Sequence, residues 1–137
     1  MRESGKISKG STWGKDDGLE VCIAGKTSKG TPAIFVVRVY SDGTVQSITD
    51  AGAPAESAQR LGKELRTITA DLKQIRPGGW SCELAIPFKA LGLKPAPGLK
   101  VAFNMCAFVN EYDNWHYWEG TQGEDWNLDQ AGIIQLE

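Results

Sequence analysis

Residues 18–24 read Gly-Leu-Glu-Val-Cys-Ile-Ala, an alternation that places Leu19, Val21 and Ile23 on one side of an extended chain and Glu20 on the other. Alternation with a period of two residues is typical of a β-strand that has one face in a core. We therefore expect a strand here, and the segments around it indicate what kind of sheet it joins.

Segments of the same character recur along the chain and are separated by glycine and proline. The expected strands are residues 33–40, 44–49, 65–73, 80–87, 100–109 and 132–136. Ser41-Asp42-Gly43 is a hairpin signal, and short helices are expected over residues 55–65 and 88–93. Many short strands separated by turns predict an all-β fold, an antiparallel, jelly-roll-like β-sandwich with one or two short helices.

Length and charge limit the classes of protein that need be considered. The 137 residues suit one domain, which we place at residues 13–137 after a flexible N-terminal segment at residues 1–12. A net charge of −2 argues against a nucleic-acid partner bound through a basic surface. No apolar run approaches the roughly 20 residues of a membrane span, and the first residues contain no apolar stretch of a signal peptide.

Three cysteines, Cys22, Cys82 and Cys106, lie far apart in the sequence, and His116 is the single histidine. An odd number of cysteines at this spacing fits neither a disulfide framework nor a zinc motif. We expect three small, buried thiols in strands. For His116 we expect a packing or hydrogen-bonding role.

The second faces of the strands carry long polar side chains set among small ones. Glu20, Glu83 and Asn104 occupy such positions, and Arg38 is able to join them from its own strand. Small neighbours leave room above a sheet, and directed donors and acceptors suit sugar hydroxyls. Two other interpretations stay open: the two glutamates are paired with Arg38 or with backbone donors, or they form the acid/base couple of a glycosidase.

Residues 111–127 are rich in aromatic rings that lie among charged, amide and glycine residues. Trp115, Trp118 and Trp126 are the indoles of this stretch, and such surroundings favour a binding platform over a core. In an extended chain Trp115 and Tyr117 share one face, so only part of the cluster reaches a single ligand. The hydrogen-bonding candidates of the stretch are Tyr112, Asn114, Glu119 and Asn127, and Tyr117 is also predicted to bind the ligand.

Two metal-based interpretations also arise from the sequence. Asp16 and Asp17 offer carboxylate oxygens that suit Ca²⁺, although their spacing matches no calcium loop and a solvated turn is the alternative. Met105 and His116 are a thioether and an imidazole, a known pair of axial haem ligands. Met105 lies on the apolar list of its strand, which favours core packing.

Two segments together resemble the family 9 carbohydrate-binding modules and the wider DOMON-like β-sandwich group. They are Trp-Gly-Lys-Asp-Asp-Gly-Leu-Glu-Val at residues 13–21 and Gly-Trp-Ser-Cys-Glu-Leu-Ala-Ile-Pro at residues 79–87. Residues 88–92, 98–104 and 130–136 continue the likeness, which covers most of residues 13–136. The Asp-Asp-x-x-Glu and Trp-x-x-Glu-x-x-Ile-Pro patterns are marks of a fold rather than of a chemistry.

The resemblance implies an antiparallel sandwich that binds glycans, is often attached to secreted polysaccharide-degrading enzymes and sometimes holds Ca²⁺. Tryptophans usually supply the sugar site of this family, a part that Trp115, Trp118 or Trp126 would play here. Such domains usually have several strands before the Asp-Asp segment, and only about a dozen residues precede it in this chain. Either those strands are absent and a partner chain covers the opened sheet edge, or the polypeptide is a fragment. In the first case an uncovered edge favours association, and a homodimer is expected.

The sequence therefore predicts a non-catalytic carbohydrate-binding domain with a glycan partner and an extracytoplasmic location. Three alternatives belong to other classes. The first is a saccharide-active enzyme that uses Glu20 and Glu83, or a metal held by His116 and carboxylates. The second is a haem-binding electron-transfer domain of the DOMON type, and the third is a structural interaction domain. A sandwich fold alone does not distinguish them.

Overall fold

The computed structural model describes residues 6–72 and 78–137. Within these ranges, a large sheet contains six strands in the order β3-β2-β1-β6-β7, with β8 also paired to β6, and a small sheet contains β4 and β5. Every pair is antiparallel. The strands are β1 Gly18–Lys26, β2 Pro32–Tyr40, β3 Val45–Ile48, β4 Arg66–Asp71, β5 Trp80–Ala85, β6 Lys100–Val109, β7 Asn114–Tyr117 and β8 Gly132–Gln135.

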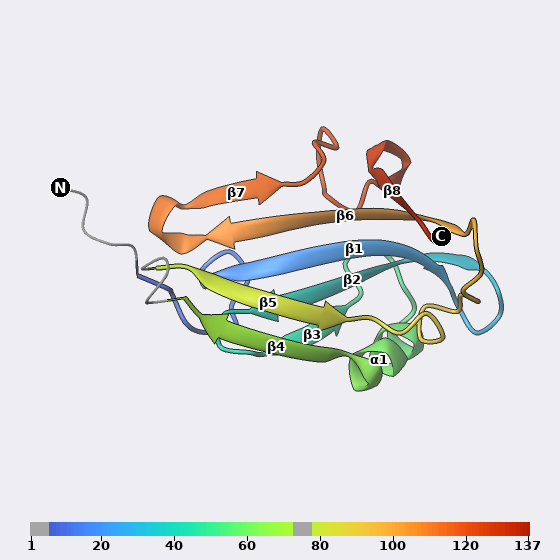
Figure 1. Cartoon of the computed structure of the whole chain (residues 1–137), viewed down its shortest axis with the longest axis horizontal. Helices are drawn as coiled ribbons and strands as arrows, with labels where there is room; N and C mark the ends of the chain where they lie inside the picture. The colour runs from blue at the N-terminus through green and yellow to red at the C-terminus, as the bar shows by residue number, and fades with distance from the viewer. Residues whose placement is uncertain (1–5, 73–77) are drawn as a thin grey trace.

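The predicted fold class is confirmed: the chain is an antiparallel β-sandwich in which the small sheet lies over the large one (Figure 1). The expected helix at residues 55–65 is α1, Ala55–Glu64, which lies at one end of the sandwich. Residues 88–93 form successive hydrogen-bonded turns instead of the expected helix, for example from the Leu93 N–H to the Phe88 carbonyl. Two 3-10 helices of three residues each are also present in the described part of the chain: η1, Asn110–Tyr112, and η2, Leu128–Gln130.

One strand within the aromatic stretch is new relative to the sequence prediction. Residues 110–129 were expected to be loop-rich, yet Asn114–Tyr117 pairs with β6 as β7. The register sets Tyr117 opposite Cys106 and Trp115 opposite Phe108. Four residues of polar and aromatic character give too short an alternation to identify a strand, and pairing with the longer β6 decides the conformation.

The core lies between the two sheets and α1. Phe35, Val37 and Val39 of β2 are fully buried there, together with Leu61 of α1 and Ile23 of β1. Cys82 and Leu84 of β5 pack against this cluster from the small sheet. Ile23, from the predicted apolar side of β1, and Cys82 and Leu84 of β5 therefore face the interior. Each fully buried large side chain contributes about 1.5–3 kcal/mol of hydrophobic stabilisation.

The opposite face of the large sheet carries the long polar side chains that the sequence predicts, among them Glu20, Arg38 and Asn104. The register sets Glu20 of β1 opposite Arg38 of β2 on one side and opposite Cys106 of β6 on the other. Tyr117 of β7 extends this row beyond Cys106. Side chains opposite one another in antiparallel pairs share a face, so four strands place one row of functional groups across the sheet.

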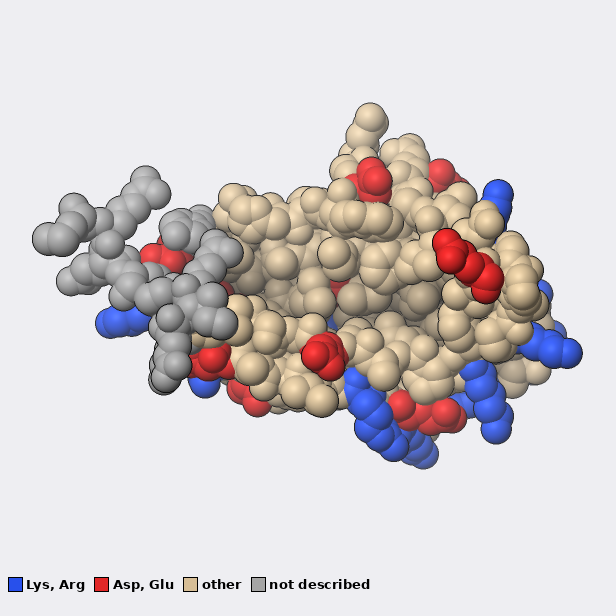
Figure 2. All heavy atoms as spheres, in the orientation of Figure 1, with Lys and Arg blue, Asp and Glu red and all other residues tan. Residues whose placement is uncertain are grey.

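The small sheet presents its outer surface on the side of the molecule shown in Figure 2. Figure 2 shows that charged side chains on the face carrying β4 and β5 lie mostly toward its margins, while its centre is largely uncharged. In the described part of the chain, β4 and β5 pair only with each other. The homodimer through an open sheet edge stays a prediction. No helix of the described residues is long and apolar enough to cross a membrane.

Candidate functional site

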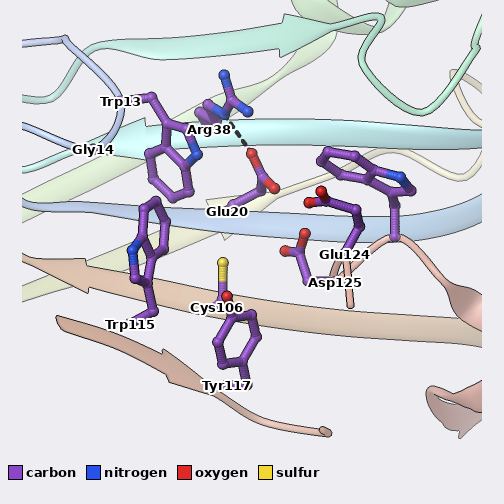
Figure 3. A pocket seen from close by; sticks show the side chains of 10 residues that line it. Trp13, Gly14, Glu20, Arg38, Cys106, Trp115, Tyr117, Glu124 and Asp125 are labelled. Atoms are coloured by element: carbon purple, nitrogen blue, oxygen red, sulfur yellow. Dashed lines mark hydrogen bonds and ion pairs between the residues drawn. The ribbon is translucent and has the colours of Figure 1, made fainter. Parts of the chain in front are cut away.

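A pocket of about 430 Å³ opens on the polar face of the large sheet (Figure 3). Its walls come from the loop before β1, from the strands β1, β2, β6 and β7, and from the segment that follows β7. The lining residues are Trp13, Gly14, Glu20, Arg38, Cys106, Trp115, Tyr117, Glu124, Asp125 and Trp126. The pocket thus gathers aromatic rings, carboxylates and one guanidinium group.

An ion pair forms the floor of the pocket. Nε of Arg38 donates to Oε2 of Glu20, and Nη2 of Arg38 donates to Oδ2 of Asp50 at 3.0 Å. Glu20 is 1% exposed. The interpretation that Arg38 pairs with Glu20 is confirmed, and the pair fixes the donors of Arg38 at the bottom of the pocket.

The environment of Glu20 favours the protonated carboxyl. Burial is the largest cause and, together with the negative charge of Asp125, raises the pKa of Glu20 from 4.5 to about 8. The Arg38 guanidinium acts in the opposite direction. The carboxyl groups of Glu20 and Asp125 therefore lie close together, and the guanidinium that pairs with Glu20 is shared with Asp50. The positive charge near these two carboxyl groups is too small to balance both of them.

Aromatic rings form one wall. The ring centroids of Trp13 and Trp115 lie 5.0 Å apart, with their planes at 68° in an edge-to-face contact. Trp115 also packs on Phe108 of β6 at 4.7 Å, and Trp13 meets Tyr40 of β2 at 6.4 Å. The Arg38 guanidinium carbon lies 4.8 Å from the Trp13 ring centroid, a cation–π contact. These contacts restrict the rotamers of Trp13 and Trp115 while both rings stay half-buried.

Asp16 and Asp17 hold the loop that presents Trp13. Asp16 accepts hydrogen bonds from the Thr12 N–H at 2.9 Å and from Oγ of Ser8 at 3.1 Å. Asp17 is buried and accepts from the Ser8 N–H at 3.0 Å and from the Asn110 N–H at 2.7 Å. Both carboxylates of the predicted calcium site therefore serve as acceptors for the loop, and the calcium prediction stays untested.

Asn104 organises the segment that covers the polar face. Its Nδ2 donates to the backbone carbonyls of Glu119 at 3.2 Å and Asp125 at 3.0 Å, and its Oδ1 accepts from the Glu119 N–H at 3.2 Å. Oγ1 of Thr121 donates to the Glu124 carbonyl at 2.8 Å and braces the same segment. Asn104 is fully buried, so it positions Asp125 and its neighbours and does not face a ligand itself.

The three predicted indoles separate in space. Trp115 and Trp126 line the pocket. Trp118 is 47% exposed, yet it packs near Gly132 and meets Phe103 edge to face at 5.4 Å, outside the pocket. Alternation along β7 explains the division, because Trp115 and Tyr117 share the pocket face and the residues between and after them do not.

The remaining predicted site residues lie elsewhere. Glu83 alternates with core-facing Cys82 and Leu84 on β5, so it is exposed on the outer side of the small sheet. The expectation that Glu83 shares a face with Glu20 is therefore wrong, because β5 belongs to the other sheet. Asn114 is exposed, and its Oδ1 accepts from the Trp115 N–H.

Four further candidates are not among the residues that line the pocket: Tyr112, Glu119, His116 and Met105. Glu119 is exposed and is held through its backbone by Asn104. Tyr112 belongs to η1, and its side chain lies outside the described part of the structure. His116 faces away from the pocket on β7 and is exposed, and Met105 is half-buried.

Five residues that line the pocket were not among the site residues predicted from the sequence: Trp13, Gly14, Cys106, Glu124 and Asp125. Trp13 stands in the Asp-Asp segment that we read only as a mark of the fold, and Glu124 and Asp125 precede Trp126 in the aromatic stretch. The proximity of Trp13 to Trp115 follows from the pairing of β1 with β6 and of β6 with β7, which the residue pattern of a single strand does not reveal.

The cysteines match the sequence expectation in part. Cys22 and Cys106 are buried, Cys82 is half-buried, and all three are free thiols. Burial is the largest cause that raises the pKa of both the Cys22 and Cys106 thiols, which favours the protonated form of each.

The comparisons with known proteins agree with this architecture. No protein-family model and no curated protein matches the chain. A solved structure of a family 9 carbohydrate-binding module from Caldicellulosiruptor kristjanssonii, in complex with cellotriose, is similar with a TM-score of 0.65 and 21% sequence identity. The match covers 98% of this chain and 65% of that one, so the chain spans less than two thirds of that structure.

The architecture is that of a β-sandwich with a polar and aromatic pocket on one sheet face. More particularly, the chain has the fold of a family 9 carbohydrate-binding module. The solved structure bears on the family 9 part of the predicted resemblance and not on the DOMON-like part.

Proposed function

We propose that the protein is a non-catalytic carbohydrate-binding domain and that the pocket between Trp13, Trp115 and the Arg38–Glu20 pair holds the sugar. The similar solved structure is described in complex with cellotriose, which supports a saccharide as the ligand class. The single observation that carries the proposal is the meeting of an aromatic wall and a buried ion pair in one pocket.

The two halves of the pocket suit the two halves of a sugar ring. Indole faces cover the apolar C–H surface of a pyranose, whereas hydroxyl groups need fixed donors and acceptors. Arg38 supplies donors from the floor, and Glu124 supplies an exposed carboxylate at the rim. A volume of about 430 Å³ lies in the range of small-ligand sites.

The contact between Trp13 and Trp115 sets the mode of stacking. Their centroids lie 5.0 Å apart, whereas a sugar inserted between two rings needs about twice the usual 3.5–4 Å carbon contact. In the conformation described, a sugar stacks on the free face of a ring and not between the two. Stacking and a few hydrogen bonds give an affinity on the order of micromolar to millimolar.

The test is a calorimetric titration of the full chain with cellotriose and a panel of soluble oligosaccharides. Trp115→Ala removes part of the wall and is expected to weaken binding at least roughly tenfold, equivalent to about 1.4 kcal/mol. Trp118→Ala is the matched control, because Trp118 is an exposed indole outside the pocket. Unchanged affinity in Trp115→Ala, or equal losses in both variants, contradicts the assignment of the pocket.

A catalytic couple of Glu20 and Glu83 has no support in this arrangement, because the two carboxyl groups lie on different sheets. Turnover of an oligosaccharide that is lost in Glu83→Gln would argue for the enzyme against our proposal. The extracytoplasmic location, the calcium ion and the homodimer stay predictions from the sequence and from the family resemblance.

A further inference from the structure

Three side chains with metal-binding atoms converge at the floor of the pocket. Glu20, Cys22 and Asp125 each offer one carboxylate oxygen or sulfur, and these three atoms lie within 4.8 Å of one another. Glu20 and Cys22 occupy alternate positions of β1 and so share one face, while Asn104 holds Asp125 above them. Figure 3 shows the carboxyl groups of Glu20 and Asp125 turned toward each other.

The group is buried and one of its atoms lacks a partner. Glu20, Cys22 and Asp125 are 1%, 0% and 4% exposed, respectively. Oδ2 of Asp125 accepts no hydrogen bond from any residue in the described part of the chain. An unpaired buried acceptor costs about 1–3 kcal/mol, and more when it is charged. An oxygen of Asp125 thus lies close to a second carboxyl and to a thiol, an arrangement that offers three ligand atoms to one cation.

We infer that Glu20, Cys22 and Asp125 bind a thiophilic divalent cation, of which Zn²⁺ is the representative. This inference goes beyond the proposed glycan function and does not depend on it. Sulfur is a poor ligand for Ca²⁺, which takes oxygen ligands, whereas Zn²⁺ accepts both cysteine sulfur and carboxylate oxygen. Three protein ligands leave the fourth tetrahedral position open to the pocket, because Glu20 and Asp125 also line it.

The geometry allows this coordination after small side-chain shifts. Zinc bonds of about 2.0–2.3 Å in a tetrahedron place neighbouring ligand atoms about 3.5 Å apart. The present limit of 4.8 Å therefore has to shrink by roughly 1 Å, which rotation of the Glu20 and Asp125 side chains provides.

The charges also balance. The two carboxylates and the Cys22 thiolate together offset the divalent cation and the Arg38 guanidinium, which stays bound to Glu20. Without the cation, burial raises the pKa of Cys22 and of Glu20, so both groups hold a proton that the metal displaces to solvent.

The experiment uses the full chain after treatment with a chelator, which is then removed. Titration with Zn²⁺ against a chromophoric competitor is expected to give one ion per chain. Titration with Co²⁺ is expected to produce a thiolate-to-cobalt charge-transfer band in the near ultraviolet, because Cys22 is a ligand. Cys22→Ser abolishes the band, and Asp125→Asn weakens affinity by more than the roughly 10–100-fold that is lost when a group that only orients a metal ligand is replaced.

Two variants serve as matched controls. Cys82→Ser removes a half-buried thiol in the small sheet, and His116→Gln removes the exposed imidazole; both are expected to keep the band and the affinity. Because Cys22 is fully buried, the near-isosteric Asp125→Asn variant and a circular dichroism spectrum separate loss of a ligand from loss of the fold.

Three results overturn the inference. The first is less than one Zn²⁺ per chain in the folded wild-type protein. The second is a cobalt band that persists in Cys22→Ser or disappears in Cys82→Ser. The third is a zinc affinity that depends on His116 and not on Asp125, which indicates an adventitious surface site.

Discussion

The two faces of the large sheet use the same strands and the same backbone hydrogen bonds for different ends. On one face of β1 and β2, Ile23, Phe35 and Val37 pack beneath the small sheet and α1. On the other face, the buried Glu20 forms an ion pair with the half-buried Arg38. Burial lowers the free energy of the apolar side chains on the first face, whereas burial raises the free energy of the charged side chains on the second face.

This difference shows where stability and binding reside. Burial of apolar side chains stabilises the sandwich by about 25 cal/mol per Å² of apolar surface. Burial of a charged pair costs desolvation that the pair's attraction often fails to recover. The proposed function assigns Glu20, Asp125 and Arg38 to recognition, so replacements on the two faces are expected to have separable effects.

The largest effect is expected on the apolar face. Phe35→Ala removes a fully buried ring and is expected to lower the free energy of unfolding by about 3–5 kcal/mol. Urea denaturation measures the change. Ile68→Ala on β4 is the control, because Ile68 is 68% exposed and its loss should change stability by no more than about 0.5 kcal/mol. Similar losses in the two variants would contradict the placement of the core.

A smaller loss of stability, coupled to loss of binding, is expected for Asn104→Ala. The variant leaves the carbonyls of Glu119 and Asp125 and the Glu119 N–H without their side-chain partner. At roughly 1 kcal/mol for each net hydrogen bond, the loss should be about 2–3 kcal/mol.

Hydrogen exchange locates the effect of Asn104→Ala in the chain. The Glu119 amide should lose protection, whereas that of Val37, which belongs to the β2 ladder, should change only with global stability. Glycan affinity should fall as well, because Asp125 and Trp126 are no longer held over the sheet. Full retention of affinity would show that this segment takes no part in the site.

Much of the fold was predictable because it rests on local patterns. Alternation identified β1, β5 and β6 and the apolar face of each, and a β-branched and aromatic run identified β2. The Asp42-Gly43 turn forms the hairpin of β2 and β3, with Gly43 at a φ of +92°. The short β7 was missed, since four residues give no clear period.

The site was only partly predictable, because alternation gives the two faces of a strand but not the sheet to which the strand belongs. Glu20, Asn104 and Arg38 share a face as expected, whereas Glu83 follows the same pattern on a strand of the other sheet. Trp13 and Trp115 are a hundred residues apart and meet only through two successive strand pairings. No single segment contains that information.

The free energy of unfolding should depend on pH through Glu20, which lies on the polar face of the large sheet. In the presence of a chelator, folded Glu20 has a pKa of about 8 against 4.5 for an unperturbed carboxyl. Between these values the native state keeps a proton that the unfolded state releases, so stability falls as pH rises, by at most about 1.4 kcal/mol per pH unit. Arg38, Asp125, Cys22 and Cys106 are titratable or charged groups that lie close to Glu20.

Glu20→Gln tests this dependence. The amide preserves the shape of the side chain and cannot ionise, so the difference in unfolding free energy between wild type and variant should shift in favour of the variant as pH rises from 5 to 8. Thermal and urea unfolding across this range measure it. A constant difference at every pH would mean that Glu20 stays ionised in the folded protein.

The smallest effect is expected at the loop that presents Trp13. Asp16→Ala removes the acceptor for the Thr12 N–H and for Ser8, at a cost of about 1 kcal/mol because both hydrogen bonds are partly exposed. A less ordered Trp13 must then be immobilised on binding, which weakens glycan affinity about two- to tenfold. Asp42→Ala removes a similar turn hydrogen bond to the Thr44 N–H between β2 and β3, away from the pocket. The two variants should therefore match in stability and differ in affinity, since only one loop carries an indole to the sugar; equal affinities would mean that the Asp-Asp segment serves the fold alone.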